Sequence, residues 1–311
     1  MEKKLTYYIS GYKIELLSDF PERLEKMLYG FGPFMTQPRT GYQSPALSPP
    51  IMQFVINESQ TLSQFAFPGS ESDLVHTFAI EEGKCTLRKS GNRYNFTILQ
   101  DSDNRLSLVL DMEQGSSLVN CMCGPSGELS PDNLKFALWI AFGFVAIPKQ
   151  TVALHSSVII CDDSAILFLG ESGTGKSTHT KLWLEHIPGS RLLNDDSPVV
   201  RIELDETNQL VPFVYGSPWS GKGRCHLNER YPVAAFVRLQ QHPSNKITKL
   251  SKLEAFGALY PSFPPAFLKD DYFEEQICGI ISNIIMTTQV YRLQCLPDST
   301  AAELVKITVF K

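Results

Sequence analysis

The fold is decided by the stretch Gly170-Glu171-Ser172-Gly173-Thr174-Gly175-Lys176-Ser177, which fits the pattern G-x-x-x-x-G-K-[ST] at every fixed position. Glycines let backbone N–H groups turn inward and approach phosphate oxygens without a Cβ in the way. The lysine can reach the β- and γ-phosphates of a nucleotide, and the hydroxyl beside it can ligate Mg²⁺. The stretch therefore predicts a Walker A loop whose nucleotide contacts come from Gly170, Ser172, Gly173, Thr174, Gly175, Lys176, Ser177 and Thr178.

The residues on either side of this loop have the pattern that a phosphate-binding loop requires. Residues 164–169 form a short apolar run typical of a buried strand, and residues 177–186 predict a helix that ends before Ile187-Pro188-Gly189. Residues 151–160 predict a further strand, which a tight turn joins to 164–169. A hairpin that runs directly into the loop differs from the βαβ arrangement of Ras-like or RecA-like proteins.

The bulk composition bounds the class of protein. A length of 311 residues suggests about two domains, and a net charge of −5 gives no argument for nucleic acid or an anionic membrane as a partner. The most apolar run, 136–147, is well short of the roughly 20 residues that span a bilayer, so it predicts a buried helix. Seven scattered cysteines without C-x-x-C or zinc spacing are typical of a reducing cytosol, so a cytoplasmic protein without membrane segments is expected.

The pattern of short segments changes near the middle of the chain. Up to about residue 124, short apolar-polar runs broken at Gly83 and Gly91 predict strands and hairpins. Residues 124–127 are rich in glycine, proline and serine, and an apolar helix is expected to follow Ser130. We therefore expect an α/β (α+β) protein with a β-rich N-terminal domain of unknown role over 1–128 and a nucleotide-binding domain over 129–311.

Two acids and one histidine are the first candidates for chemistry beside the loop. Asp195 and Asp196 end a short apolar run soon after Ser177. In phosphoryl transfer one acid can hold Mg²⁺ and another can accept the proton of an attacking hydroxyl. A solvated turn pair is the alternative for the two acids, and the nearby phosphate-binding loop favours the functional interpretation. A lone histidine such as His155, among apolar neighbours, is more often a satisfied core or half-buried residue than a catalyst.

A second loop, residues 216–224, is rich in glycine, hydrogen-bond donors and cations. It predicts a segment that closes over a nucleotide or substrate, with positive charge from Lys222 or Arg224, Trp219 packed on a base or on the substrate, and Ser220 beside it. An ordinary surface hairpin loop explains the composition equally well. The chain has no Asn-Lys-x-Asp string for guanine and no G-x-S-x-G, H-E-x-x-H or protein-kinase motif set.

These features together resemble the catalytic domain of HPr kinase/phosphorylase and its uncharacterised relatives, a family that shares its fold with ATP-dependent phosphoenolpyruvate carboxykinase. The resemblance covers about residues 151–239 and is carried by His155, the loop at 170–177, and the pair Asp195-Asp196. It implies a domain built on a mixed sheet. Two departures stand out: Thr178 occupies a position where the family usually has an acid, and residues 216–222 stand in place of the glycine-rich segment associated with dephosphorylation.

The resemblance also implies roles for individual residues. His155 and Asp195 would act near the reacting hydroxyl, with Asp195 as general base, while Ser177 and Asp196 would hold Mg²⁺. With Lys176, the catalytic set is therefore His155, Lys176, Asp195 and Asp196, and the cofactors are ATP and Mg²⁺.

The expected function is an ATP-dependent kinase that phosphorylates a serine-type hydroxyl on an unknown protein, peptide or small-molecule acceptor. A catalytically weak ATP-binding regulator or scaffold is the main alternative, and a carboxykinase-like lyase is less favoured because the short basic loop does not supply the arginines that a dicarboxylate needs. A homo-oligomer is compatible with the sequence.

Overall fold

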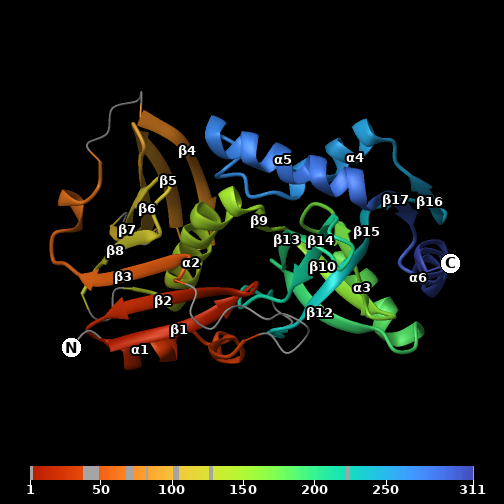
Figure 1. The fold of residues 1–311 in the computed structure, drawn as a ribbon, viewed down its shortest axis with the longest axis horizontal. Helices are drawn as coiled ribbons and strands as arrows, with labels where there is room; N and C mark the ends of the chain where they lie inside the picture. Colours follow the sequence, from red (N-terminus) through yellow and green to blue (C-terminus); the bar gives the residue numbers. More distant parts are fainter. Residues whose placement is uncertain are drawn as a thin grey trace. The chain divides into compact units, whose positions relative to one another are not determined.

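Figure 1 shows the computed structural model, which describes residues 3–37, 49–67, 73–81, 83–100, 105–125, 129–221 and 225–310. It is a mixed α/β structure with two mixed sheets, which confirms the predicted α/β (α+β) class. The chain forms two compact units: the first comprises Met1–Thr36, Ser44–Lys149 and Ala266–Glu274, and the second comprises Gln37–Gln43, Gln150–Pro265 and Glu275–Lys311. The expected domain limits of 1–128 and 129–311 stay a prediction.

The first unit contains an eight-stranded sheet in the order β1-β2-β3-β8-β7-β6-β5-β4. Parallel pairing joins β2 to β3 and β3 to β8, and the other neighbours are antiparallel. The strands are β1 Lys3–Ile9, β2 Tyr12–Ser18, β3 Met52–Glu58, β4 Leu74–Ile80, β5 Gly83–Ser90, β6 Arg93–Gln100, β7 Leu106–Glu113 and β8 Leu118–Cys123. The short helices are α1 Pro21–Met27, η1 Gly32–Met35 and η2 Leu62–Gln64.

The apolar run near residue 140 forms helix α2, Pro131–Ala146, followed by η4, Ile147–Lys149. Its first turn is capped by Ser130, whose Oγ accepts a hydrogen bond from the Asn133 backbone N–H at 3.0 Å. Most of its side chains are buried, and it contacts β3 and β7, so the prediction of a buried helix is confirmed. Within the described residues, no helix is both long enough and apolar enough to cross a membrane.

The second unit contains a nine-stranded sheet in which β12-β10-β11-β15-β14-β13-β9 are neighbours, β17 pairs with β15, and β16 pairs with β17. Its strands are β9 Thr151–Ala153, β10 Ser156–Cys161, β11 Ser164–Leu169, β12 Arg191–Asp196, β13 Val199–Leu204, β14 Leu210–Tyr215, β15 Arg230–Gln241, β16 Lys246–Lys249 and β17 Gln289–Cys295. Its helices are α3 Lys176–His186, α4 Lys252–Leu259, η5 Tyr260–Ser262 and α6 Ser299–Val309, and α5 Asp271–Thr287 belongs to it from Glu275 onward.

Strand β15 organises the second sheet, because its two halves pair differently. Residues 230–232 pair antiparallel with β14, residues 233–238 pair parallel with β11, and residues 235–241 pair parallel with β17. Val237 and Leu239 face an apolar core that includes Trp183 of α3 and Val305 of α6. Because side chains alternate along a strand, Arg238 faces the other side, where α4 supplies a carbonyl partner.

The run 151–160, expected as one strand, is broken at Leu154 and His155. The reason is a change of pairing partner: β9 pairs with β13, whereas β10 pairs with β12. At the break, the Leu154 N–H donates to the Pro198 carbonyl at 3.0 Å and the His155 N–H to the Ser262 carbonyl at 2.9 Å. His155 therefore lies at a bend, and its side chain is 45% exposed instead of being held within a strand.

Candidate functional site

The predicted phosphate-binding loop connects β11 to α3. β11 lies between β10 and β15, and its residues 165–169 are fully buried, so the loop starts from a rigid point. Thr174 Oγ1 donates to the Glu171 carbonyl at 2.7 Å and closes the turn. A Cβ added at Gly170 would lie 2.4 Å from Thr174 Oγ1, so the turn requires glycine there.

The loop ends at Gly175, which takes a left-handed conformation with φ of 102° as the N-cap of α3. An L side chain is strained in that conformation, so the glycine is needed where the helix begins. The first N–H groups of a helix have no partner within the helix, and with the helix dipole they favour an anion. The described loop therefore has the local geometry of an anion-binding turn.

Lys176 is 9% exposed, and its ammonium group is folded back onto the loop. Nζ donates to the Gly170 carbonyl at 2.7 Å and to the Glu171 carbonyl at 3.2 Å, and it lies 2.9 Å from His155 Nε2. Burial lowers the pKa of Lys176, and the charges of Asp196, Asp195 and Glu171 oppose that shift. The loop thus holds a desolvated cation, which an anionic ligand would stabilise.

The contact with Lys176 fixes the hydrogen-bonding pattern of His155. An ammonium group has only donors, so Nε2 of the imidazole accepts and the ring proton lies on Nδ1. Nδ1 is 3.3 Å from Asp196 Oδ1. His155 therefore links the lysine of the loop to one of the two acids, although sequence reasoning alone favoured a core or half-buried histidine over a catalytic one.

The two acids end β12, which pairs with β10 beside the loop, and they have different neighbours. Asp195 Oδ1 accepts hydrogen bonds from the buried Ser157 hydroxyl and, at 3.3 Å, from the Ser177 hydroxyl. Asp196 faces His155, and its side chain is 46% exposed. The structure therefore brings together all the residues of the predicted catalytic set, with Asp195 on the Ser177 side and Asp196 on the His155 side.

The second predicted loop lies against the same acids over its described part, residues 216–221. Ser220 forms a β-bridge with Asp196, and the Gly221 N–H donates to the Asp195 carbonyl at 2.8 Å. A Cβ at Gly221 would lie 2.5 Å from that carbonyl oxygen, so only glycine fits. Trp219 is only 9% exposed, which leaves little of its ring for a ligand. Lys222 and Arg224 lie outside the described residues.

One cation of this site was not predicted. Arg238 of β15 lies opposite Leu169 in the parallel register with β11, and its Nη2 pairs with Glu171 Oε1 of the loop at 2.5 Å. Nη1 donates to the Ala258 carbonyl at 3.2 Å and to Ser262 Oγ at 3.4 Å. An arginine within an apolar strand is a weak signal in the sequence, and only the strand register brings it next to the loop.

The oxygen atoms of this region have the chemistry of a Mg²⁺ site. No cluster of three or more His, Cys, Asp or Glu side chains suited to a metal occurs in the described part of the chain. Magnesium usually binds through one or two carboxylates together with phosphate and water oxygens, so such a cluster is not required. In addition, the buried Ser156 and Ser220 hydroxyls, which neighbour Asp196 in the sheet, have no hydrogen-bond partner among the described residues. The donors present therefore fit a hydrated oxygen-ligated cation.

Comparisons with known proteins add little beyond this geometry. No protein-family model and no curated protein matches the chain. Among solved structures, the chain is similar to an HPr(Ser) kinase/phosphatase from Coxiella burnetii, with 15% sequence identity and a TM-score of 0.25. The match covers 52% of this chain and 95% of that protein. At this identity and TM-score, the similarity does not indicate a function for this chain.

Proposed function

We propose that the second unit is an ATP-dependent phosphotransferase that moves the terminal phosphoryl group of ATP to a hydroxyl group. The observation that carries this proposal is the convergence of a phosphate-binding loop, its buried lysine and two carboxylates at one edge of a sheet. Ser177 of the loop lies 3.3 Å from Asp195, and Asp196 is linked through His155 to Lys176. Phosphoryl transfer depends mostly on such positioning and on electrostatic stabilisation.

The loop residues would bind the triphosphate. Backbone N–H groups of residues 172–176 would surround the β-phosphate, and Thr178 would contact the same chain of phosphates. The Lys176 ammonium group would exchange its carbonyl partners for phosphate oxygens, which relieves the desolvation of its charge. The same charge would stabilise the γ-phosphoryl group during transfer.

The contacts favour particular roles for the two acids. Ser177 and Asp195 lie together, so they are the residues that would hold Mg²⁺. When bound, Mg²⁺ neutralises charge that develops on the phosphate oxygens. The Asp196 side chain is 46% exposed and has His155 as a neighbour, which suits the general base. These roles exchange the two acids relative to the assignment that the family resemblance implies.

The proposed reaction balances without a further reagent. The oxygen of the acceptor hydroxyl forms a bond to the γ-phosphorus, the bond between that phosphorus and the bridging oxygen of ATP breaks, and the hydroxyl proton moves to a carboxylate. ADP leaves with the electron pair of the broken bond. A serine-type hydroxyl on a protein, peptide or small molecule is the proposed acceptor, and water can replace it in a slow background reaction.

A matched pair of variants, Asp195→Asn and Asp196→Asn, tests the proposal. We expect Asp196→Asn to retain Mg²⁺-dependent ATP binding and to lower ADP formation about 10²- to 10⁴-fold, the usual contribution of a general base. Asp195→Asn should instead raise the Mg²⁺ concentration needed for tight ATP binding. The opposite pattern would restore the assignment taken from the resemblance. Wild-type rates in both variants would rule out the phosphotransferase proposal.

A regulator or scaffold that binds ATP with little turnover is the second candidate, and one observation favours it. The loop is closed by its own groups, because Lys176 bonds loop carbonyls and Glu171 pairs with Arg238. ATP binding without ADP formation, measured across a panel of hydroxyl acceptors, would support this second function.

A further inference from the structure

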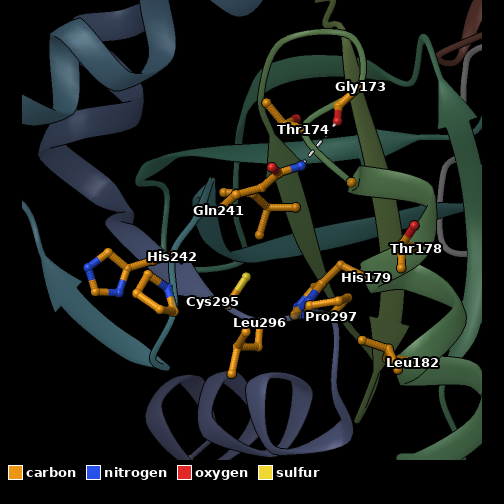
Figure 2. Close-up of a pocket in the computed structure, with 13 residues that line it drawn as sticks. Gly173, Thr174, Thr178, His179, Leu182, Gln241, His242, Cys295, Leu296 and Pro297 are labelled. Atoms are coloured by element: carbon orange, nitrogen blue, oxygen red, sulfur yellow. Dashed lines mark hydrogen bonds between the residues drawn. The ribbon is translucent and has the colours of Figure 1, made fainter.

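A pocket of about 600 Å³ opens beside the phosphate-binding loop (Figure 2). Three segments line it: the loop with the first two turns of α3, the end of β15 with the turn that follows, and the end of β17 with the turn that follows. The alternation of side chains along β15 explains its position, because Leu239 and Gln241 line the pocket while Arg238 points to the opposite face.

The pocket and the acid pair lie on different sides of the start of α3. Thr178 lines the pocket, whereas its neighbour Ser177 donates to Asp195. Successive residues of a helix point about 100° apart, since 3.6 residues make one turn. A triphosphate that follows the loop with its terminal phosphate at the acids therefore has its other end directed to the pocket, where Gly173 and Thr174 also form part of the wall.

The walls of the pocket suit a flat ring with polar edges. Leu182, Leu239, Leu296 and Pro297 supply apolar surface. His242 supplies a polar ring at its edge, with Nδ1 3.2 Å from the Ser244 backbone nitrogen and 3.1 Å from the Ser244 carbonyl oxygen. Small-molecule sites typically have such an apolar lining with few polar groups, and volumes of roughly 300–1,000 Å³.

Gln241 connects this pocket to the loop. Its side-chain amide donates to the Gly173 carbonyl at 3.4 Å, the dashed line in Figure 2. A ligand in the pocket would thus contact a residue that is already bonded to the phosphate-binding turn. We propose that the pocket binds the purine base of a nucleoside triphosphate, an inference that rests on the proposed nucleotide-binding function and adds its base specificity.

The test compares ligands that share the phosphates and differ in the base. Isothermal titration calorimetry with Mg²⁺ would give dissociation constants for ATP, CTP and inorganic triphosphate. We expect ATP to bind at least about tenfold more tightly than inorganic triphosphate, and CTP to fall between them because one ring covers less apolar wall. Equal affinities for ATP and inorganic triphosphate, or for ATP and CTP, would overturn the proposal.

Pocket-filling variants make the test specific. Leu182→Trp and Leu296→Trp should weaken ATP binding about tenfold or more and leave triphosphate binding unchanged. Leu184→Trp is the matched control, because Leu184 is on α3, is 45% exposed and lies outside the pocket. Leu296 is 40% exposed, so its variant should fold even if Leu182→Trp disturbs the core that Leu182 contacts. Equal loss of ATP and triphosphate binding in both variants would contradict the proposal.

The outcomes also separate this inference from the proposed function. Triphosphate binding without any preference for a base would remove the pocket proposal and leave the phosphotransferase proposal standing. A preference for ATP without ADP formation would support the pocket proposal and remove the phosphotransferase proposal. If neither ATP nor triphosphate binds, both proposals fail together.

Cys295 gives a measurement that needs no substitution, because it lines the pocket. Burial raises the pKa of its thiol, so alkylation should be slow and is best followed at alkaline pH by mass spectrometry. ATP should slow alkylation of Cys295 several-fold, and inorganic triphosphate should not, with Cys278 on α5 as the internal reference. Equal protection by both ligands would contradict a base in the pocket.

Discussion

The two compact units use buried charge in different ways. In the first unit, Asp270 is 4% exposed and accepts from Lys89 at 2.8 Å and from the buried Tyr94 hydroxyl at 3.0 Å. In the second unit, the buried ammonium group of Lys176 is held by loop carbonyls and an imidazole nitrogen. The Asp196 side chain nearby remains 46% exposed.

This contrast distinguishes polar clusters that stabilise the fold from polar clusters that are arranged to bind a ligand. A buried charge with an opposite charge and further hydrogen bonds is costly to disrupt, because the partner would be left desolvated. A buried cation next to half-exposed acids gains more from a bound anion than from its present neighbours. Substitutions around Asp270 should therefore lower stability, and substitutions around Lys176 should lower function.

The largest effect is expected for Lys176→Met. Without the ammonium group, ATP turnover should fall about 10²- to 10³-fold, as for the loss of one electrostatic contact to a transition state. The free energy of unfolding should change little. Burial lowers the pKa of Lys176, which means that the wild-type fold is penalised for desolvating this charge, and the variant no longer has that penalty. ADP release and a thermal melt measure the two quantities.

Lys181→Met is the control for this variant, since Lys181 is exposed on the same helix. It should preserve both turnover and stability. If Lys176→Met turned over ATP at the wild-type rate, the buried charge of the second unit would not serve catalysis, and the proposed difference between the two units would be wrong.

The next effect is a loss of stability in the first unit. Asp270→Ala leaves the Lys89 ammonium group and the buried Tyr94 hydroxyl without their carboxylate, and it removes the acceptor for the Phe273 N–H at the start of α5. We expect a loss of about 2–4 kcal/mol, because the buried Tyr94 hydroxyl and the Phe273 N–H lose their acceptor, whereas the Lys89 side chain is 31% exposed and can reach water. Urea denaturation measures the loss.

Glu275→Ala, at an exposed position of α5, is the matched control and should cost under about 1 kcal/mol. ATP turnover per folded Asp270→Ala molecule should equal that of the wild type. A loss of turnover as large as that of Lys176→Met would show that the Asp270 cluster is not purely structural.

Local features of the sequence predicted much of the second unit. The glycine pattern with its flanking strand and helix is contiguous, so it predicted β11, the loop and α3 without knowledge of any distant contact. The acid pair was expected at a strand end, and β12 ends there. The turn chemistry of each segment was sufficient for these predictions, because the interactions that form them are within the segment.

The remainder depends on contacts between distant residues. The break at His155 arises because β9 and β10 pair with different strands some 40 residues later in the chain. The position of Arg238 depends on its register with β11, and the Asp270 cluster joins residues separated by more than 170 positions. Sheet register and such pairings follow from tertiary packing, which a single sequence does not display.

The smallest of the three effects concerns pH and again the first unit. Glu15 is 5% exposed, and burial alone would raise its pKa, but hydrogen bonds from Lys13, Lys4 and Gln53 outweigh burial and lower the pKa to about 2. Since the ordinary pKa of a glutamate side chain is 4.5, the unfolded chain binds more protons than the folded chain between pH 4.5 and pH 2. The stability from this carboxylate is therefore present above pH 4.5 and is lost as the pH falls to about 2.

Glu15→Gln should consequently be less stable than the wild type at pH 7, by at most about 3 kcal/mol, from the linkage of 1.36 kcal/mol per pKa unit. The difference should shrink as the pH falls through this window and vanish near pH 2. Glu25→Gln, an exposed position on α1, should show no such trend when urea midpoints are compared across the same pH range. A difference between Glu15→Gln and the wild type that stays constant with pH would mean that the shape of the side chain matters there and its charge does not. In that case, the first unit would no longer be an example of charge used for stability.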